Sequence, residues 1–183
     1  MGILVAFAPF IVFAVIDRLF GSIMGLSGAT LVALGLLLRD WITPGKTPKI
    51  LEVGTALLFG GLAIYGALGS PTWSVIGVRL RVDSGLLLIV VISMLLGRPF
   101  TLQYAREQVA REVWDRPEFI RTNYVITGIW ALAFAAMVVA ELALLYAPGL
   151  PPRVGIIAII LALVGAVKFT GWYPDRARAM ALR

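Results

Sequence analysis

Six apolar stretches fill most of this 183-residue chain, and each approaches the length needed to cross a lipid bilayer. A spanning helix needs about 20 predominantly apolar residues. The clearest stretch runs from Val125 to Tyr146 and contains one charged residue, Glu141. In lipid, backbone N–H and C=O groups must bond within the chain, and continuous apolar blocks do so as helices. We therefore expect an all-α fold, a polytopic transmembrane helical bundle.

The composition supports the same class. Hydrophobic residues make up 60% of the chain and charged residues 14%, against roughly 45–50% and 25% in soluble domains. One bundle with short connections leaves no room for a separate soluble domain of about 100 residues. We therefore expect a single transmembrane domain over residues 1–183.

Two of the six expected helices are the weakest. The first contains Pro9 and ends at Asp17 and Arg18, so we expect it to kink or to insert only partly. The fourth is short unless it includes Trp73 to Asp83, and five full spans are therefore the alternative to six. The first block lacks a positively charged leading region and a small-residue cleavage pattern, so we expect it to be retained rather than removed as a signal peptide. The six expected helices cover residues 3–20, 22–38, 51–69, 84–97, 122–146 and 154–172.

Basic residues predict the orientation of the helices, because Lys and Arg concentrate in cytoplasmic loops. With six spans, eleven Lys and Arg residues fall on one face of the membrane and four on the other. The four are Arg18, Arg79, Arg81 and Arg153. We therefore expect both termini in the cytoplasm.

The longest connection, residues 98–121, carries acidic and basic residues three to five positions apart. That spacing is typical of an exposed helix, in which such pairs each stabilise by a few tenths of a kcal/mol. The apolar residues between the charges would rest on the headgroup layer or on the floor of the helix bundle. We predict an amphipathic cytoplasmic surface helix, with a docking surface for a cytoplasmic partner as its alternative role. The candidate interface residues are Arg98, Arg106, Arg111, Arg116 and Arg121.

Charges near the opposite ends of the helices form a second candidate site. A charge at the membrane centre costs about 2.5 kcal/mol or more, so each such residue needs a reason. We predict an outward-facing polar pocket in which Glu141 pairs with an arginine and which would take a proton or a substrate. The alternative is that these residues lie at the water interface and only end their helices. The candidates are Asp17, Arg18, Arg79, Arg81, Asp83 and Glu141.

Two shorter patterns add expectations. The second half of residues 73–83 alternates apolar and polar side chains, which predicts a half-inserted strand or an interfacial amphipathic segment. Its Arg79 and Arg81 would contact lipid phosphate or simply anchor the chain. The spacing Gly21-x-x-x-Gly25 is typical of close helix packing, either within the chain or in a homodimer.

The chain has no Cys and no His, which excludes disulfides, thiol nucleophiles and zinc or haem ligation by those side chains. It also lacks a phosphate-binding loop, a nucleophile elbow and a metalloprotease motif. We expect no enzymatic activity and no cofactor; an intramembrane acid–base enzyme using Asp17, Asp83 or Glu141 is the alternative. The net charge of +6 is explained by basic residues that flank membrane helices, so membrane lipids rather than nucleic acid are the expected partners.

Several local patterns resemble the bacterial intracellular septation protein A family of small inner-membrane proteins. They are Phe7-Ala8-Pro9-Phe10-Ile11-Val12-Phe13 in the first helix, Phe59-Gly60-Gly61-Leu62 in the third, and Arg98-Pro99 after the fourth. The order of the spans also agrees over most of the chain. Asn123 and Trp130 are similar to the family's Trp, Asn and Trp before its fifth span. The intervals from Trp114 to Asn123 and from Asn123 to Trp130 are wider here, as in a distant relative.

The resemblance implies a multi-pass protein of the bacterial cytoplasmic (inner) membrane that is associated with cell division and envelope maintenance and has no established catalytic residues. Our first hypothesis is a non-enzymatic membrane protein that supports cell-envelope assembly or division through contacts with a membrane-protein partner or a second copy. Residues 98–121 would form its interface. The second hypothesis is a small transporter or lipid-handling protein with the polar pocket open to the non-cytoplasmic side.

Overall fold

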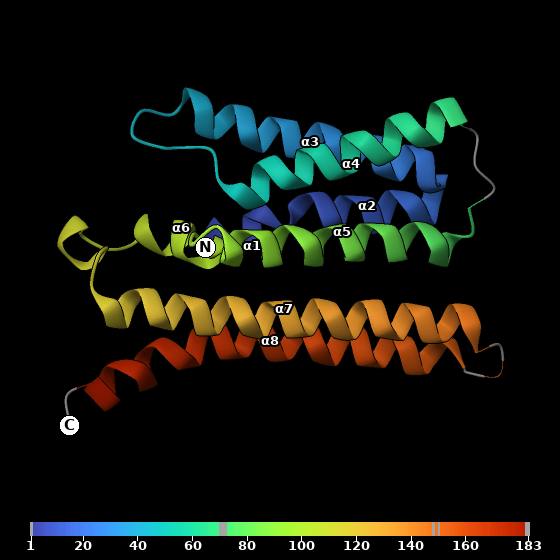
Figure 1. Cartoon of the computed structure of the whole chain (residues 1–183). Coiled ribbons are helices and arrows are strands. Elements are labelled where there is room, and N and C mark those ends of the chain that lie inside the picture. The colour runs from blue at the N-terminus through green and yellow to red at the C-terminus, as the bar shows by residue number, and fades with distance from the viewer. Residues whose placement is uncertain (1, 70–72, 148, 150, 182–183) are drawn as a thin grey trace. The chain divides into compact units, whose positions relative to one another are not determined.

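The computed structural model describes residues 2–69, 73–147, 149 and 151–181 (Figure 1). Helices account for nearly all of these residues, and no strand occurs among them, which confirms the all-α class. The elements are α1 (Gly2–Ala6), α2 (Ala8–Phe20), α3 (Ser22–Ile42), α4 (Ile50–Gly69), α5 (Val75–Leu95), α6 (Phe100–Arg106), the 3-10 turn η1 (Arg111–Val113), α7 (Pro117–Tyr146) and α8 (Pro152–Ala181).

The chain divides into two compact units, Met1–Ile89 and Val90–Arg183. The first holds α1 to α4 and most of α5. The second holds the last turns of α5 together with α6, η1, α7 and α8. A single domain over residues 1–183 stays a prediction.

Five helical stretches in the described part of the chain are long and apolar enough to cross a membrane. A further stretch qualifies only when α5 and α6 are taken together, and these two helices meet at a bend of 71°. Alone, α5 carries three charges in its first half, Arg79, Arg81 and Asp83. These charges explain why α5 by itself does not qualify as a membrane span. The expected bundle of five or six spans is thus confirmed. The five stretches are Ile3–Phe20, Ser22–Ile42, Ile50–Gly69, Pro117–Tyr146 and Pro152–Ala177.

Two local expectations near the first and fourth helices have different outcomes. The predicted kink at Pro9 is present, because α1 ends at Ala6 and α2 begins at Ala8 with the proline in its first turn. The strand considered for residues 73–83 is wrong, whereas the extension of the fourth helix into this segment is confirmed, since α5 begins at Val75. The hydroxyl of Ser74 accepts a hydrogen bond from the backbone N–H of Gly77 at 3.0 Å, which caps a helix start and commits the segment to α5.

The predicted single surface helix over residues 98–121 is also wrong. The segment contains the short α6, then η1, and α7 already begins at Pro117. Proline favours the first position of a helix and disrupts later ones, so Pro117 starts α7 rather than continuing an earlier helix. Four of the seven α6 residues are buried, so α6 is not an exposed helix. They are Phe100, Thr101, Leu102 and Tyr104.

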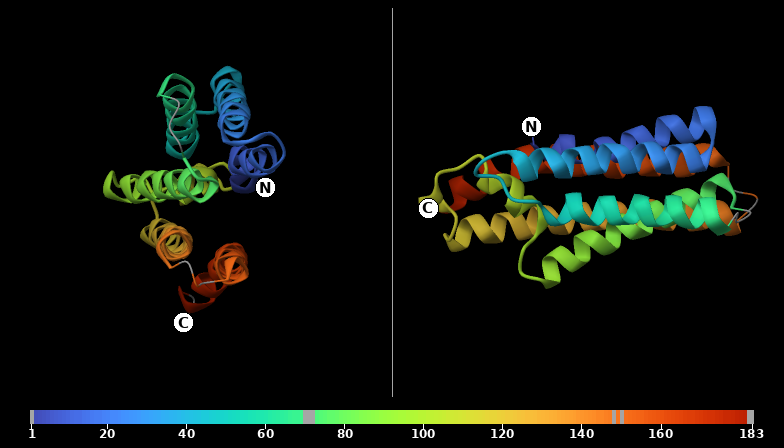
Figure 2. Two further views of the ribbon diagram at one scale, coloured as in Figure 1. Left: turned by 90° about the vertical axis from the view of Figure 1, so that its right-hand side faces the viewer. Right: turned by 90° about the horizontal axis from the view of Figure 1, so that it is seen from above.

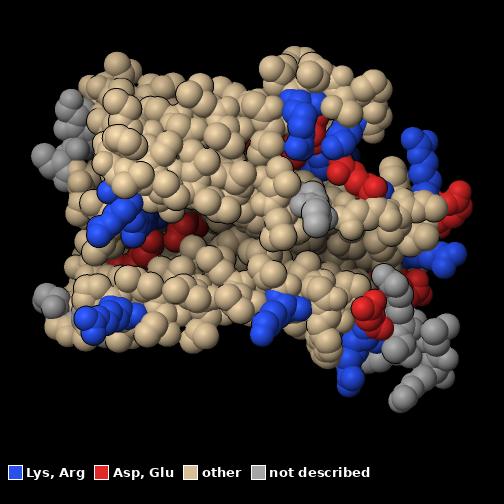
Figure 3. Space-filling view, turned by 180° about the vertical axis from the view of Figure 1, so that it is seen from behind, with Lys and Arg blue, Asp and Glu red and all other residues tan. Residues whose placement is uncertain are grey.

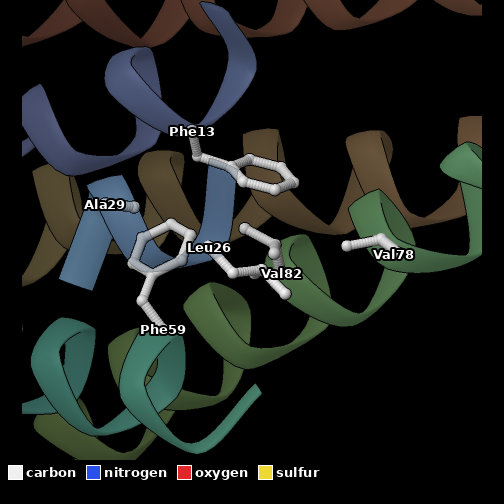
Figure 4. Close-up of a cluster of buried hydrophobic side chains, with 6 residues drawn as sticks. All are labelled: Phe13, Leu26, Ala29, Phe59, Val78 and Val82. Atoms are coloured by element: carbon white, nitrogen blue, oxygen red, sulfur yellow. The ribbon is translucent and has the colours of Figure 1, made fainter. Parts of the chain in front are cut away.

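The core of the first unit is formed by side chains from α2, α3, α4 and α5 (Figure 4). Phe59 lies at its centre, with its ring 5.6 Å from that of Phe13 and 5.0 Å from that of Phe10, centroid to centroid. Such tilted and edge-on contacts are favourable for aromatic rings. The core therefore ties four helices together with apolar contacts. Its buried members are Phe13, Leu26, Ala29, Phe59, Val78 and Val82.

The helices α2 and α3 approach closely because of two glycines. Gly21 separates them with φ of +90°, a conformation that favours glycine. A Cβ on Gly25 would lie 2.9 Å from the backbone nitrogen of Asp17, which leaves room only for hydrogen. Close packing at Gly25 is therefore within the chain, one of the two roles expected for this spacing.

In the second unit, α7 and α8 lie side by side along most of their length, and the last turns of α8 bend away (Figures 1 and 2). A Cβ on Gly155 would lie 2.5 Å from Leu144, so the helices also approach closely at this end. Toward their other end, the indole N–H of Trp130 donates to the hydroxyl of Thr170 at 2.9 Å. These contacts give the pair a fixed register.

The close approach at Gly25 predicts a specific loss of stability. Gly25→Ala should lower the free energy of unfolding by about 1–3 kcal/mol, because the new methyl group meets the α2 backbone, which cannot move aside. The measurement is unfolding of the detergent-solubilised protein. Gly61→Ala is the matched control, since its Cβ meets nothing within 4 Å, and it should leave stability unchanged or raise it by up to about 1 kcal/mol. Equal effects of the two substitutions would contradict the packing argument.

Candidate functional site

Charged side chains gather near the ends of the helices, and the surfaces between are mostly apolar (Figure 3). In the first unit two charged clusters are well defined. One surrounds Asp17 and the other surrounds Asp40. Both lie against α3, in which Ser22 and Asp40 are about 27 Å apart at about 1.5 Å per residue. That separation is close to the roughly 30 Å of a bilayer's hydrocarbon core.

The Asp17 cluster joins α2, α3 and α5. The Asp17 side chain is fully buried. Its Oδ1 accepts a hydrogen bond from the hydroxyl of Ser22 at 2.7 Å, and its Oδ2 accepts one from Nη2 of Arg79 at 3.3 Å. The sequence places Asp17 here because the Gly21 turn brings Ser22 back over the last turn of α2. The ion pair with Arg79 then connects this turn to α5.

The other candidates of the predicted polar pocket have different surroundings. Arg18 is exposed, and Asp83 is buried at 8% exposure. The guanidinium of Arg81 lies over the ring of Trp73 at 4.6 Å from its centroid and donates to the carbonyl of Gly77 at 2.6 Å. Trp73 in turn stacks on Tyr65 at 5.2 Å. The structure thus brings Asp17 and Arg79 together and directs Arg81 to an aromatic pair.

Glu141, the sixth candidate, lies in α7 of the second unit and is buried at 4% exposure. Its pairing with an arginine of the first unit stays a prediction. So does a pocket shared by all six residues. The Asp17 cluster, at one end of α3, fits the alternative in which charges lie at the membrane edge.

The predicted interface segment, residues 98–121, is organised around α7 and Trp114. The hydroxyl of Thr101 in α6 donates to the carbonyl of Asn123 at 2.9 Å and lies 2.7 Å from the hydroxyl of Thr127. The backbone N–H of Phe100 donates to the hydroxyl of Ser93 at 3.1 Å, which supports the bend between α5 and α6. These buried contacts dock α6 onto α7.

Trp114 organises the remainder of the segment. Its indole N–H lies 3.1 Å from the carbonyl oxygen of Arg106 and 3.3 Å from that of Val109. The guanidinium groups of Arg106 and Arg111 lie 5.4 and 5.7 Å from the centroid of its ring. Arg106 also forms an ion pair with Asp115 at 3.8 Å. Arg106 is therefore a partly buried structural residue, whereas the other four interface candidates, Arg98, Arg111, Arg116 and Arg121, are exposed.

The Asp40 cluster was not among the sequence-based candidates. It consists of Arg39, Asp40, Lys46, Lys49 and Glu52, from the end of α3, the connecting loop and the start of α4. Asp40, Lys49 and Glu52 are buried, with side chains at 0%, 4% and 2% exposure. The ammonium of Lys49 bonds to Oδ2 of Asp40 and lies 3.5 Å from Oε1 of Glu52. On the outer side, Nε and Nη2 of Arg39 donate to Oδ1 of Asp40 at 2.9 and 2.8 Å.

The sequence held a signal for this cluster. Asp40 and Glu52 are separated by eleven residues at the junction of two apolar blocks, and Lys49 directly precedes the second block. An acid within a helical turn of a span needs a nearby cation, because an unpaired buried charge is costly. Ending the predicted helix at residue 38 assigned Asp40 to the loop. In the structure α3 continues to Ile42 and places Asp40 on the buried face.

In chemical terms, both clusters hold carboxylates with cations. Within the described ranges, no group of three or more Asp and Glu side chains is arranged to hold a metal ion. Comparison of the chain with protein-family models, curated proteins and solved structures finds no match.

The Asp17–Arg79 pair gives a prediction for the first cluster. Arg79→Gln should lower the free energy of unfolding by about 1–3 kcal/mol, because one oxygen of a buried carboxylate loses its charged donor. Arg18→Gln removes an equal charge from an exposed position in the same turn as Asp17, and should change stability by less than about 0.5 kcal/mol. The two variants are compared by chemical unfolding in detergent. A similar loss in both would show that net charge, not this pair, stabilises the unit.

The Asp40 cluster gives a second prediction. Lys49→Gln should lower the free energy of unfolding by about 3–5 kcal/mol, because it leaves two buried carboxylates without the ammonium between them. Lys46→Gln removes a partly exposed cation 3.7 Å from Asp40 and should cost less than about 1 kcal/mol. Thermal unfolding of both variants in one detergent tests this difference. A Lys49→Gln protein as stable as Lys46→Gln would refute the role of Lys49.

Proposed function

We propose that this chain is a non-enzymatic integral membrane protein that supports assembly or division of the bacterial cell envelope by binding a membrane-protein partner. Its several apolar spans support residence in a membrane, where its helices contact lipid. The finer assignment, to the cytoplasmic membrane with both termini in the cytoplasm, rests on the distribution of Lys and Arg. The association with division rests on the resemblance to the septation protein A family.

The observation that favours a binding role over transport is the core of the first unit. Between the Asp17 and Asp40 clusters lie Phe13, Phe59 and Leu26, all at 4% exposure or less. A transport path for an ion or polar substrate through this unit would need polar groups along its length. The carboxylates at the two ends are already held by serine, arginine and lysine side chains. This arrangement supports a role exerted at the surface.

The surface we assign to the partner is formed by Arg98, Arg111, Arg116 and Arg121. These residues are exposed, and the segment that carries them is held on α7 by buried contacts of Thr101. A preorganised surface binds with less loss of conformational entropy than a mobile one. These arginines lie among four exposed acidic residues, Glu107, Glu112, Asp115 and Glu118, so the surface would select a partner by complementary positions of charge rather than by net charge.

Reversal of charge at this surface tests the proposal. Arg116→Glu combined with Arg121→Glu should abolish co-purification of cross-linked membrane partners and fail to restore division in cells that lack the native protein. Insertion should be unaffected, because neither side chain is buried. Measurements are quantitative mass spectrometry of cross-linked complexes and cell length by microscopy.

The matched control is Arg153→Glu combined with Arg176→Glu, which makes the same change in net charge at exposed positions near the two ends of the α8 span. The control should retain both the partners and the ability to restore division. Full complementation by the Arg116 and Arg121 variant would place the interface elsewhere. Normal division and an intact envelope in cells without the protein would contradict the proposed function itself.

A further inference from the structure

The Asp40 cluster has an outer side that the proposed function does not use. Arg39 and Lys46 are partly exposed, with side chains at 46% and 35% exposure. Nη2 of Arg39 and Nζ of Lys46 lie 2.8 and 3.7 Å from the same atom, Oδ1 of Asp40. One buried carboxylate oxygen therefore holds two cations beside each other at the surface.

These two cations have donors to spare. A guanidinium has five N–H donors, and only Nε and Nη2 of Arg39 bond to Asp40. At 3.7 Å, Lys46 contacts Asp40 as an ion pair and not through a hydrogen bond. Because Asp40 already fixes both groups, a ligand that bridges them would lose little side-chain entropy on binding.

The charge of the cluster favours an anion. Three cations, Arg39, Lys46 and Lys49, face two carboxylates, Asp40 and Glu52, so the five groups carry one surplus positive charge. The buried Lys49 is enclosed between the two carboxylates. The surplus positive charge is therefore accessible to a ligand at the exposed pair, Arg39 and Lys46.

The position of the cluster selects the kind of anion. The neighbouring Trp41 and Ile42 are 76% and 71% exposed at the end of a spanning helix. Tryptophan at such a position is typical of the headgroup layer of a bilayer. The anion that is abundant at that depth is the phosphate of a lipid headgroup, which Arg and Lys bind through charge-assisted hydrogen bonds.

We propose that Arg39 and Lys46, held together by Asp40, form a binding site for a phosphate group, carried by an anionic lipid headgroup or by a soluble phosphate ester. The site lies in the first unit. It shares no residue with the arginine surface of residues 98–121. Its test therefore does not depend on whether that surface binds a partner.

The experiment measures binding of phosphatidylglycerol to the purified full-length protein in nanodiscs that contain otherwise zwitterionic phosphatidylcholine, by native mass spectrometry. Arg39→Gln combined with Lys46→Gln should weaken phosphatidylglycerol binding roughly 30-fold. This corresponds to about 1 kcal/mol for each basic group near an anionic lipid, at about 1.4 kcal/mol for each factor of ten. Arg153→Gln combined with Arg176→Gln, the control of equal charge, should leave binding within about twofold of the parent.

Inorganic phosphate and glycerol 3-phosphate distinguish the two sources of the ligand. Displacement of phosphatidylglycerol by either at millimolar concentration, from the parent but not from the double variant, supports recognition of the phosphate group itself. Binding of the soluble phosphates without binding of the lipid would overturn the lipid source and keep the site. Equal loss in the double variant and in the control would overturn the site, since general surface charge would then explain binding.

Two single variants keep the test valid if the double variant does not insert. Lys46→Gln alone changes a loop residue, and it should weaken binding about fivefold. Arg39→Lys keeps the charge but removes the planar donor geometry. If charge alone were recognised, Arg39→Lys would bind phosphatidylglycerol as tightly as the parent. We expect it to bind more weakly than the parent. Binding equal to the parent in both single variants would overturn the proposal.

Discussion

The cost of placing charge in hydrocarbon determines where this chain keeps its ionisable side chains, and those positions in turn fix its helices. Asp17 and Asp40 are buried, yet each meets a basic side chain near the end of a helix. Between them α3 contributes Leu26 and Ala29 to an apolar core. The charged clusters therefore connect α2, α3, α4 and α5 at their ends, while dispersion contacts hold the same helices in the middle.

The fold class could be predicted from the sequence, because apolar length alone distinguishes spanning helices. Details that depend on a single capping or breaking residue were harder. Pro9 was correctly identified as a break, whereas Ser74 was not recognised as the cap that makes residues 75–83 helical. In residues 98–121 the spacing of charges suggested one helix. Burial of α6 on α7 and the start of α7 at Pro117 outweighed that local pattern.

The candidate sites show the same limit. Sequence reasoning placed Asp17 and Arg79 at the same side of the membrane, but their contact joins residues 62 positions apart, which no periodicity could reveal. Arg106 was grouped with the exposed arginines, although its guanidinium lies over Trp114. The predicted end of α3, at residue 38, lies four residues before its end in the structure, at Ile42. Asp40 therefore falls in the predicted loop, and its burial cannot be foreseen from that boundary. Burial and pairing, which decide chemistry, depend on tertiary packing that local spacing does not encode.

The connection between α2 and α3 has a consequence for how the charge of Asp17 is neutralised. Because Gly21 alone separates the two helices, they form a helical hairpin without a loop of its own. One oxygen of the Asp17 carboxylate is bonded within this hairpin by the hydroxyl of Ser22. The other oxygen is bonded by Arg79, 62 positions later in the chain, so the hairpin acquires its counter-charge only when α5 packs against it.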